Sequence, residues 1–211
     1  MKIGVIIPDR NDRQKFLEHC KFMLSKQTMQ PTFIEVVNFV NPTNNFDLTQ
    51  RIRIGFERLK NICDCVLIIE NDDYYSENYI ETMVNKWIEL GKPELLGTDY
   101  TYYYHIFKKQ YRKLVHKGRA SLMNTLINTN LNVNWCDNNE VYLDLHIWKK
   151  HNGMTFTPEN PIAVGIKHGI GLCGGNGHNG MQFQENDFDL QFLKSIVDKE
   201  SFNFYKSLIN A

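Results

Sequence analysis

VLIIENDDYYSENYI, residues 66 to 80, runs from an apolar stretch directly into a turn that carries three carboxylates, Glu70, Asp72 and Asp73. The apolar part, residues 65–69, is rich in β-branched and aliphatic side chains and is typical of a buried strand. Ligands of open α/β sheets bind beyond the carboxyl ends of the strands, so residues at this turn are expected to line a site. The stretch therefore predicts both an α/β sheet and an acidic edge to it.

The same order of strand and helix occurs twice before this stretch. Residues 2–8 and 33–40 are apolar, β-rich runs, while the apolar spacing of residues 12–26 and of the segment after Asp47 predicts helices. A third helix is expected after the acidic turn, with Ser76 as its cap. Such alternation indicates a parallel sheet core with helices on both faces.

The second half of the chain has a less regular pattern. Residues 94–107 are expected to form one or two strands, residues 141–150 a short helix and residues 161–168 another strand. Two helices, over 186–198 and 201–209, are expected to close the chain. We expect a single globular domain of 211 residues.

The composition gives little support for a nucleic acid or an anionic membrane as the partner. Lys plus Arg number 24 and Asp plus Glu also number 24, so the net charge is zero. The five cysteines are odd in number and scattered, which favours a reducing, cytoplasmic setting. No apolar run approaches the roughly 20 residues of a membrane span.

The three carboxylates of the acidic turn repel one another unless a cation or several hydrogen-bond donors compensate them. Mg²⁺ or Mn²⁺ is usually held by one or two carboxylates, with substrate phosphates completing its coordination shell. Adjacent Asp72 and Asp73 therefore predict a site for Mn²⁺ or Mg²⁺ and a diphosphate. The alternative is that these residues and Ser76 only stabilise the helix that follows, although one carboxylate would serve that purpose.

Two motifs resemble a known family. IGVIIPDRND, residues 3–12, and LIIENDDYYSENYIETMV, residues 67–84, are similar to the first strand and the D-x-D-D turn of nucleotide-sugar-dependent glycosyltransferases of the GT-A fold, in particular the large family-2-like inverting group. Glu70 replaces the usual first aspartate. The likeness covers about the first hundred residues well and the remainder weakly.

The resemblance implies a Rossmann-like, mixed and mainly parallel sheet flanked by helices in one domain, residues 1–211. Residues 1–99 would bind the nucleotide sugar, and residues 100–211, with the C-terminal helices, would face the acceptor. The resemblance implies a metal-dependent glycosyl transfer from a nucleoside diphosphate sugar by an inverting single displacement, with a uridine diphosphate sugar favoured.

Carried over position by position, the resemblance places Pro8, Asp9 and Asn11 near the nucleotide base and ribose. Arg51 would present a basic group to the donor, although a solvated helix face is the alternative for it.

At the acidic turn, the resemblance places Glu70 and Asp72 beside the ribose and diphosphate, with Asn71 between them among the substrate-binding residues. Asp72 or Asp73 would hold the metal.

The base that accepts the proton of the acceptor hydroxyl is expected near the segment 138–150. Its Asp144-Leu145 resembles the closing D-L of the family's E-D-x-D-L helix start, but Val141 and Tyr142 stand where the acidic pair would be. The base is therefore open between Asp144 and Glu140, and catalysis itself is in doubt. A helix-stabilising carboxylate with no catalytic role is the alternative for Asp144.

A glycine-rich segment, residues 165–183, follows the last predicted strand. Glycines let backbone N–H groups approach a bound anion, so a phosphate-covering lid is expected here. Lys167 would contact substrate and His168, or else His178, would complete the metal shell, unless these histidines are structural.

The acceptor remains open among a glycan, a small molecule and a modified DNA base. Residues 100–119 interleave tyrosines with basic residues. A two-stranded ribbon with one apolar face and one solvated basic face is the preferred explanation, although the pattern would also suit an anionic acceptor. Two other readings also remain open. One is a sugar-phosphate nucleotidyltransferase, whose glycine-rich phosphate loop is missing after residues 2–8, and the other is a non-catalytic nucleotide-sugar or carbohydrate binder.

Overall fold

The computed structural model of the chain describes residues 1–41, 46–169 and 182–209. Its larger sheet has the strand order β2-β1-β3-β8-β5-β9. The bounds are Ile3–Pro8 for β1, Phe33–Val37 for β2, Cys65–Ile68 for β3, Leu95–Thr98 for β5, Thr125–Asn128 for β8 and Gly153–Phe156 for β9. Within the described residues, every strand of this sheet except β8 runs in the same direction. The sheet is therefore mixed and mainly parallel, as expected from the sequence.

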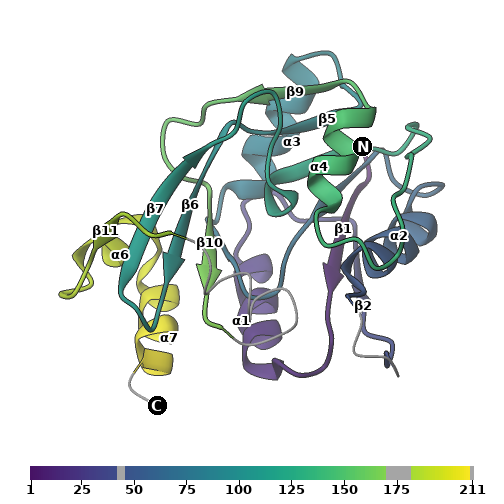
Figure 1. The fold of residues 1–211 in the computed structure, drawn as a ribbon. Helices are drawn as coiled ribbons and strands as arrows, with labels where there is room; N and C mark the ends of the chain where they lie inside the picture. Colours follow the sequence, from purple (N-terminus) through teal and green to yellow (C-terminus); the bar gives the residue numbers. More distant parts are fainter. Residues whose placement is uncertain (42–45, 170–181, 210–211) are drawn as a thin grey trace.

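Helices cover both faces of this sheet (Figure 1). Because side chains alternate along a strand, Val5 and Ile7 of β1 pack into one apolar cluster and Ile6 into another. The first cluster includes residues of α1, Gln14–Ser25, and α3, Tyr79–Glu89; the second includes residues of α2, Leu48–Leu59, and α4, Leu143–Lys150. The alternating strands and helices of the first half thus form the expected layers.

A second sheet lies beside the first and has the order β11-β7-β6-β10-β4 (Figure 1). Its strands are β4, Tyr74–Tyr75; β6, Tyr100–His105; β7, Gln110–Val115; β10, Ala163–Lys167; and β11, Glu185–Asn186. Strands β6 and β7 form the expected antiparallel ribbon, and β10 runs parallel to β6. A short 3-10 turn, Leu122–Asn124, precedes β8. One apolar cluster contains residues of both sheets and of α7, Lys199–Ile209.

The expected helix over 186–198 is wrong in its first part. The helix α6 spans only Gln191–Ile196, and Leu190 before it has a left-handed backbone with φ of 61°. The Asp187 carboxylate accepts the backbone N–H groups of Phe192, at 2.8 Å, and Leu193, at 3.0 Å, and so occupies the first amides of the helix. It also accepts the hydroxyl of Tyr104 at 2.9 Å, which anchors α6 to the second sheet.

The expected capping of α3 by Ser76 is also wrong. The helix begins at Tyr79 after Asn78, and the Ser76 hydroxyl donates to the Asn78 side-chain oxygen at 2.7 Å. The free amide of Ile80 instead donates to the side chain of Gln27, which follows α1, at 2.9 Å. A residue 53 positions away therefore supplies the cap, which local sequence does not reveal.

None of the helices in the described ranges has the length and apolar character needed to cross a bilayer.

Candidate active site

Three carboxylates gather at the turn that follows β3. One oxygen from each of Glu70, Asp72 and Asp73 lies within 4.8 Å of the other two. The turn is held by its backbone: the Asp73 N–H donates to the Glu70 carbonyl at 3.2 Å, and the Glu70 N–H donates to the hydroxyl of Tyr75 at 2.8 Å. The chain then returns as β4, which pairs with β10.

Asp72 is held between two side chains from distant parts of the chain. Its Oδ2 lies 2.7 Å from Nε2 of His168, beyond β10, and also accepts a hydrogen bond from the guanidinium of Arg13, before α1. Burial alone would raise the pKa of Asp72, but Arg13 and His168 outweigh it and hold that pKa well below its usual range. Asp72 is therefore ionised. The structure brings the expected metal ligands Asp72 and His168 together.

Asp73 has a different environment. Its Oδ1 accepts the backbone N–H of Ile166 at 2.7 Å and lies 4.0 Å from Nζ of Lys167. Its Oδ2 is buried and has no hydrogen-bond partner among the described residues. Burial raises the pKa of Asp73, and the nearby carboxylates Asp72 and Glu70 raise it further against the opposing effect of Lys167.

Glu70 is the partly exposed member of the cluster. Burial of its carboxyl group raises its pKa to about 7, opposed by Lys167 and Arg13 and reinforced by the negative charges of Asp72 and Asp144. These carboxylates thus carry unbalanced negative charge when all are ionised.

The residues of the acidic turn fit a hard divalent cation. They offer carboxylate oxygens, a neighbouring imidazole and one buried carboxylate oxygen, Asp73 Oδ2, for which the described residues provide no donor. Oxygen-rich donor sets of this kind suit Mg²⁺ or Mn²⁺ rather than thiophilic metals.

Asp144 lies in the first turn of α4, where the sequence predicted it. Its Oδ2 accepts a hydrogen bond from Nη1 of Arg119 at 2.8 Å. Burial nevertheless raises the pKa of Asp144 above its usual value, against the effect of Arg119. A carboxylate with a raised pKa is a better proton acceptor at neutral pH than an ordinary aspartate.

Glu140, the other candidate base, is exposed and serves the turn before α4. Its Oε1 accepts the backbone N–H groups of Val141, at 2.9 Å, and Tyr142, at 3.0 Å. It does not line the pocket described next.

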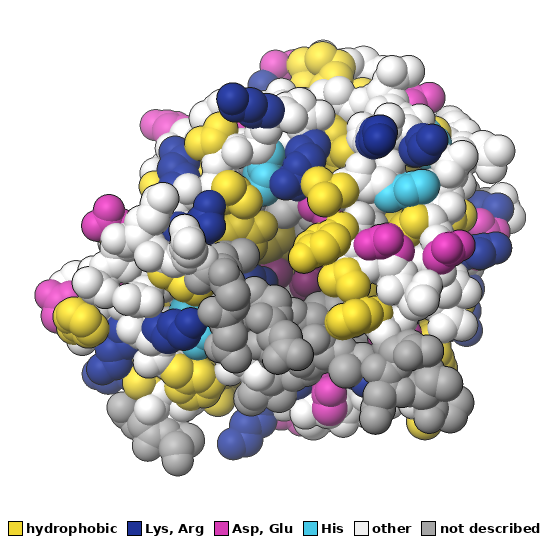
Figure 2. Space-filling view, viewed as in Figure 1, with side chains coloured by type: hydrophobic (Ala, Val, Ile, Leu, Met, Phe, Trp, Pro, Cys, Tyr) yellow, Lys and Arg dark blue, Asp and Glu magenta, His cyan; other side chains and the backbone are white. Residues whose placement is uncertain are grey.

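A pocket of about 330 Å³ joins the acidic turn to Asp144. This volume lies within the range of small-molecule sites. The pocket is also lined by Lys167 at the end of β10 and by Tyr103 of β6. Figure 2 shows a hollow near the middle of this face, with acidic side chains at its bottom and hydrophobic side chains along one rim.

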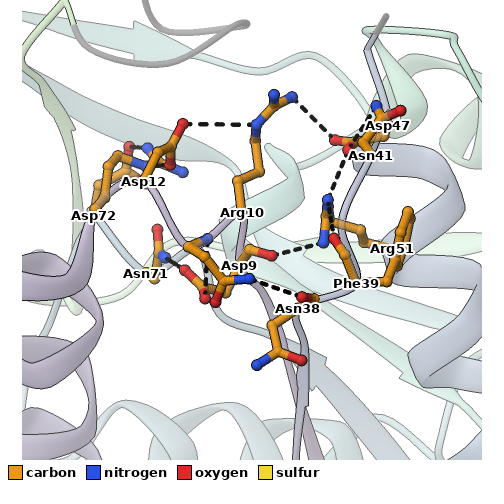
Figure 3. Close-up of polar contacts among 12 residues, drawn as sticks. Asp9, Arg10, Asp12, Asn38, Phe39, Asn41, Asp47, Arg51, Asn71 and Asp72 are labelled. Carbon is orange, nitrogen blue, oxygen red and sulfur yellow. Dashed lines mark hydrogen bonds and ion pairs between the residues drawn. The ribbon is translucent and has the colours of Figure 1, made fainter. Parts of the chain in front are cut away.

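The loop after β1 connects three strands through Asp9. This residue is fully buried; its N–H donates to the carbonyl of Val37 at 3.0 Å, and its Oδ1 accepts the side-chain amide of Asn71 at 2.8 Å (Figure 3). Asn11 adopts a left-handed backbone with φ of 63°, which lets its amide reach the carbonyl of Asn38 at 2.9 Å. Pro8, the last residue of β1, is buried.

Arg51 is buried in α2, with 2% of its surface exposed. Its guanidinium donates to the carbonyls of Asp9 at 2.6 Å and Phe39 at 2.9 Å, and to the carboxylate of Asp47 at 2.7 Å (Figure 3). It also lies over the Phe39 ring, 4.1 Å from the centroid. These contacts hold the ends of β1 and β2 together, and they favour a structural role over the solvated helix face considered from the sequence.

The basic residues between 100 and 119 do not form one cationic track. Lys113 lies over the Tyr100 ring at 4.0 Å, Arg112 donates to the carbonyl of Gln182 at 3.0 Å, and Arg119 pairs with Asp144. Of the glycine-rich segment, residues 170–181, with His178, lie outside the described residues.

Three residues of the site were not singled out from the sequence: Arg13, which pairs with Asp72, and Tyr103 and Arg119, which line the pocket. Arg13 stands close to the first motif, so its proximity to Asp9 was a usable signal. Tyr103 and Arg119 lie within the tyrosine-rich and basic stretch, but nothing local distinguishes them from their neighbours.

The fold resembles solved structures although the sequence does not match known families. No family model and no curated protein matches the chain. The crystal structure of S. aureus TarS residues 1–349 in complex with UDP-GlcNAc superposes with a TM-score of 0.60 at 13% identity, covering 99% of this chain and 65% of that one. The chain has the GT-A fold. The expectation from the two sequence motifs is thereby confirmed at the level of fold.

Two further TarS structures agree with this GT-A assignment. A crystal structure of S. aureus TarS gives a TM-score of 0.57 at 13% identity, covering 79% of this chain and 37% of that one. TarS 1–349 in complex with UDP gives 0.54 at 12% identity, covering 79% and 60%. The chain thus spans less than two thirds of the length of the structures it matches.

Proposed function

We propose that this GT-A protein is a metal-dependent glycosyltransferase that moves a sugar from a nucleoside diphosphate sugar to an acceptor hydroxyl. The observation that carries the proposal is that one pocket is lined both by Glu70 and Asp73 of the acidic turn and by Asp144. Donor activation and proton removal need such groups on opposite sides of one sugar.

The donor end of the pocket is the acidic turn. Asp72, Asp73 and His168 would hold Mn²⁺ or Mg²⁺, and a bound cation there would neutralise the negative charge of the departing diphosphate. Lys167, which is buried beside Asp73, adds a fixed positive charge at the same place. Glu70 and Asn71 would contact the ribose or the sugar.

The nucleoside would lie over the loop after β1. Pro8, Asp9 and Asn11 form the floor of this region, and Arg51 fixes its shape through the carbonyl of Asp9. We assign Arg51 a positioning role because its Nη groups are already bonded to the protein.

The chemistry assigned to Asp144 is removal of the acceptor proton. As the acceptor oxygen forms a bond to the anomeric carbon, the bond from that carbon to the phosphate oxygen breaks, and the hydroxyl proton passes to the Asp144 carboxylate. The raised pKa of Asp144, caused by burial, supports this role. Attack opposite to the leaving group inverts the anomeric centre. Glu140 is the less favoured base because its carboxylate holds backbone amides.

A uridine diphosphate sugar is the favoured donor, since TarS of the same fold has been crystallised with UDP-GlcNAc and with UDP. The acceptor is a glycan, another small molecule or a modified DNA base. A nucleotidyltransferase is less well supported because the loop after β1, PDRNDRQKF, has no glycine.

The decisive experiment is a thermal-shift panel of nucleoside diphosphate sugars, with and without Mn²⁺. A ligand that binds only the folded state raises the melting temperature by mass action, so a Mn²⁺-dependent rise with one donor is expected. Release of the nucleoside diphosphate with a matching acceptor then separates an enzyme from a non-catalytic binder. No shift with any nucleotide sugar in the presence of Mn²⁺ contradicts the proposal.

A further inference from the structure

Tyr103 faces the pocket from the middle of the second sheet. It pairs with Arg112 of β7 and with Gly165 of β10. Its neighbours Tyr102 and Tyr104 point to the opposite face, where Tyr102 contacts the Phe192 ring at 5.3 Å. Tyr103 is thus separated from the tyrosines that anchor α6.

The ring of Tyr103 packs directly against the backbone of Gly165, in space that a side chain at position 165 would occupy. A Cβ atom added to Gly165 would lie 2.5 Å from Cδ1 and 2.7 Å from Cε1 of Tyr103. Contacts this short do not occur, so any side chain at position 165 would displace the ring. Gly165 has an ordinary backbone, and the ring of Tyr103 therefore accounts for the glycine at this position.

Among the residues that the structure describes, the hydroxyl of Tyr103 has no hydrogen-bond partner, although the residue lines the pocket. Burial raises its pKa to about 12; Lys167 opposes this, and the carboxylates of Asp73 and Asp144 add to it. The hydroxyl therefore keeps its proton and is able to donate.

Tyr103 lines the pocket together with a residue of the proposed diphosphate site and with the proposed base. Nζ of Lys167, at the diphosphate end, lies 5.2 Å from the centroid of the Tyr103 ring. Asp144, the proposed base, lines the same pocket as Tyr103. In a single displacement the transferred sugar must lie between the leaving diphosphate and the base. Tyr103 therefore lies where that sugar would be.

We propose that Tyr103 is a positioning residue that binds the transferred sugar of the donor, with its hydroxyl donating a hydrogen bond to a sugar oxygen. This inference rests on the proposed glycosyl transfer and adds to it a specific contact to the sugar rather than to the nucleotide. A contact of this kind distinguishes the nucleotide sugar from the free nucleoside diphosphate.

The test compares Tyr103→Phe with Tyr102→Phe, the adjacent tyrosine on the opposite face of the same strand. Affinities for UDP and for the UDP-sugar that binds the wild type best are measured by calorimetry in Mn²⁺, together with kcat and KM. Loss of one hydrogen bond is expected to weaken UDP-sugar binding by Tyr103→Phe about 3- to 10-fold and leave UDP binding unchanged. Tyr102→Phe is expected to match the wild type in both.

A second comparison tests the packing of the Tyr103 ring on Gly165. Gly165→Ala is expected to weaken sugar binding in the wild type but to add little to Tyr103→Ala, because the ring that it displaces is then absent. Unfolding by urea shows whether each variant is folded.

The possible results separate the two proposals. Equal loss of UDP and UDP-sugar affinity in Tyr103→Phe, or no loss of either, overturns the role of Tyr103 while the proposed function stands. A wild type that binds no nucleoside diphosphate sugar in Mn²⁺ overturns both. If the effects of Gly165→Ala and Tyr103→Ala on UDP-sugar affinity are additive, the proposed packing of the Tyr103 ring on Gly165 is also contradicted.

Discussion

Nε2 of His168 lies 2.7 Å from Oδ2 of Asp72, although the two residues are 96 positions apart. The pairing of β10 with β4 and β6 brings the end of β10 onto the turn after β3. Two groups able to bind one cation thus come from the two halves of the chain. The conformation of the acidic turn therefore depends on a residue that lies far from it in sequence.

Asp72→Asn and Asp73→Asn are expected to remove the dependence of UDP binding on Mn²⁺. Each change removes a charged oxygen ligand, and loss of UDP affinity of roughly 10- to 100-fold in Mn²⁺ is expected for each. In the wild type, removal of the metal with EDTA is expected to have a similar effect. Calorimetric titration with UDP measures both.

Glu77→Gln is the matched control for these variants, because Glu77 is an exposed carboxylate on the same segment. It is expected to bind UDP as the wild type does. Mn²⁺-dependent binding that survives in both aspartate variants would contradict the proposed metal site.

Asp144→Asn is expected to lower kcat by about 10²- to 10⁴-fold, the contribution typical of a general base, while the affinity for the donor stays within about twofold. Glu140→Gln is expected to retain most of its activity, since its carboxylate binds the amides of Val141 and Tyr142. Single-turnover kinetics and donor titrations are compared for both variants. The reverse pattern, with turnover lost only in Glu140→Gln, would assign the base to Glu140.

The acidic limb of the pH profile provides a further prediction. A base must be deprotonated to act, so kcat/KM is expected to rise with pH through the pKa of Asp144, which burial raises above its ordinary value. Arg119 lowers that pKa, so Arg119→Gln is expected to move the limb to higher pH. A limb that stays in place when Arg119 is replaced would show that another group controls it.

The first half of the fold was predictable because its signals are local. The apolar runs that became β1 and β3 and the spacing of α2 each lie within one segment. Their order also placed the acidic turn at the right edge, because parallel strands end on the same side of a sheet.

The second half depended on contacts that no short window contains. Strands β8 and β9 are four residues each, as β3 is, but their sequences TLIN and GMTF are not continuous apolar runs, and neither was predicted. The burial of Arg51 and the place of Tyr103 beside Lys167 depend on neighbours more than ten residues away. Residue type alone could not separate Tyr103, which lines the pocket, from Tyr102 and Tyr104.

Arg51→Met is expected to destabilise the fold by about 3–5 kcal/mol, because it removes the buried cation that pairs with Asp47 and donates to three backbone carbonyls, those of Asp9, Val37 and Phe39. Arg53→Met, an exposed arginine on the same helix, is expected to change stability by no more than about 0.5 kcal/mol. Urea unfolding measures both. Equal stability of the two variants would contradict the structural role of Arg51.

The burial of His116 is expected to make the free energy of unfolding depend on pH. It is buried, with Nε2 3.1 Å from the hydroxyl of Thr101, and burial lowers its pKa to about 4 from an ordinary value of 6.5. Between these two values the unfolded chain binds more protons at this residue than the folded chain does. The free energy of unfolding is therefore expected to be highest above pH 6.5 and to fall as the pH is lowered towards 4, by on the order of 2–3 kcal/mol from His116.

His116→Gln isolates this contribution from the carboxylates that titrate in the same range. Its amide is able to donate to Thr101 but does not titrate, so the fall in stability between pH 6.5 and 4 is expected to be shallower than in the wild type. His146→Gln is the control, because His146 lies near the surface, with its ring 3.2 Å from the Asn134 side chain. The two variants differ from the wild type in one imidazole each. If the free energy of unfolding of His116→Gln falls with pH in parallel with that of the wild type, His116 is not held neutral by burial.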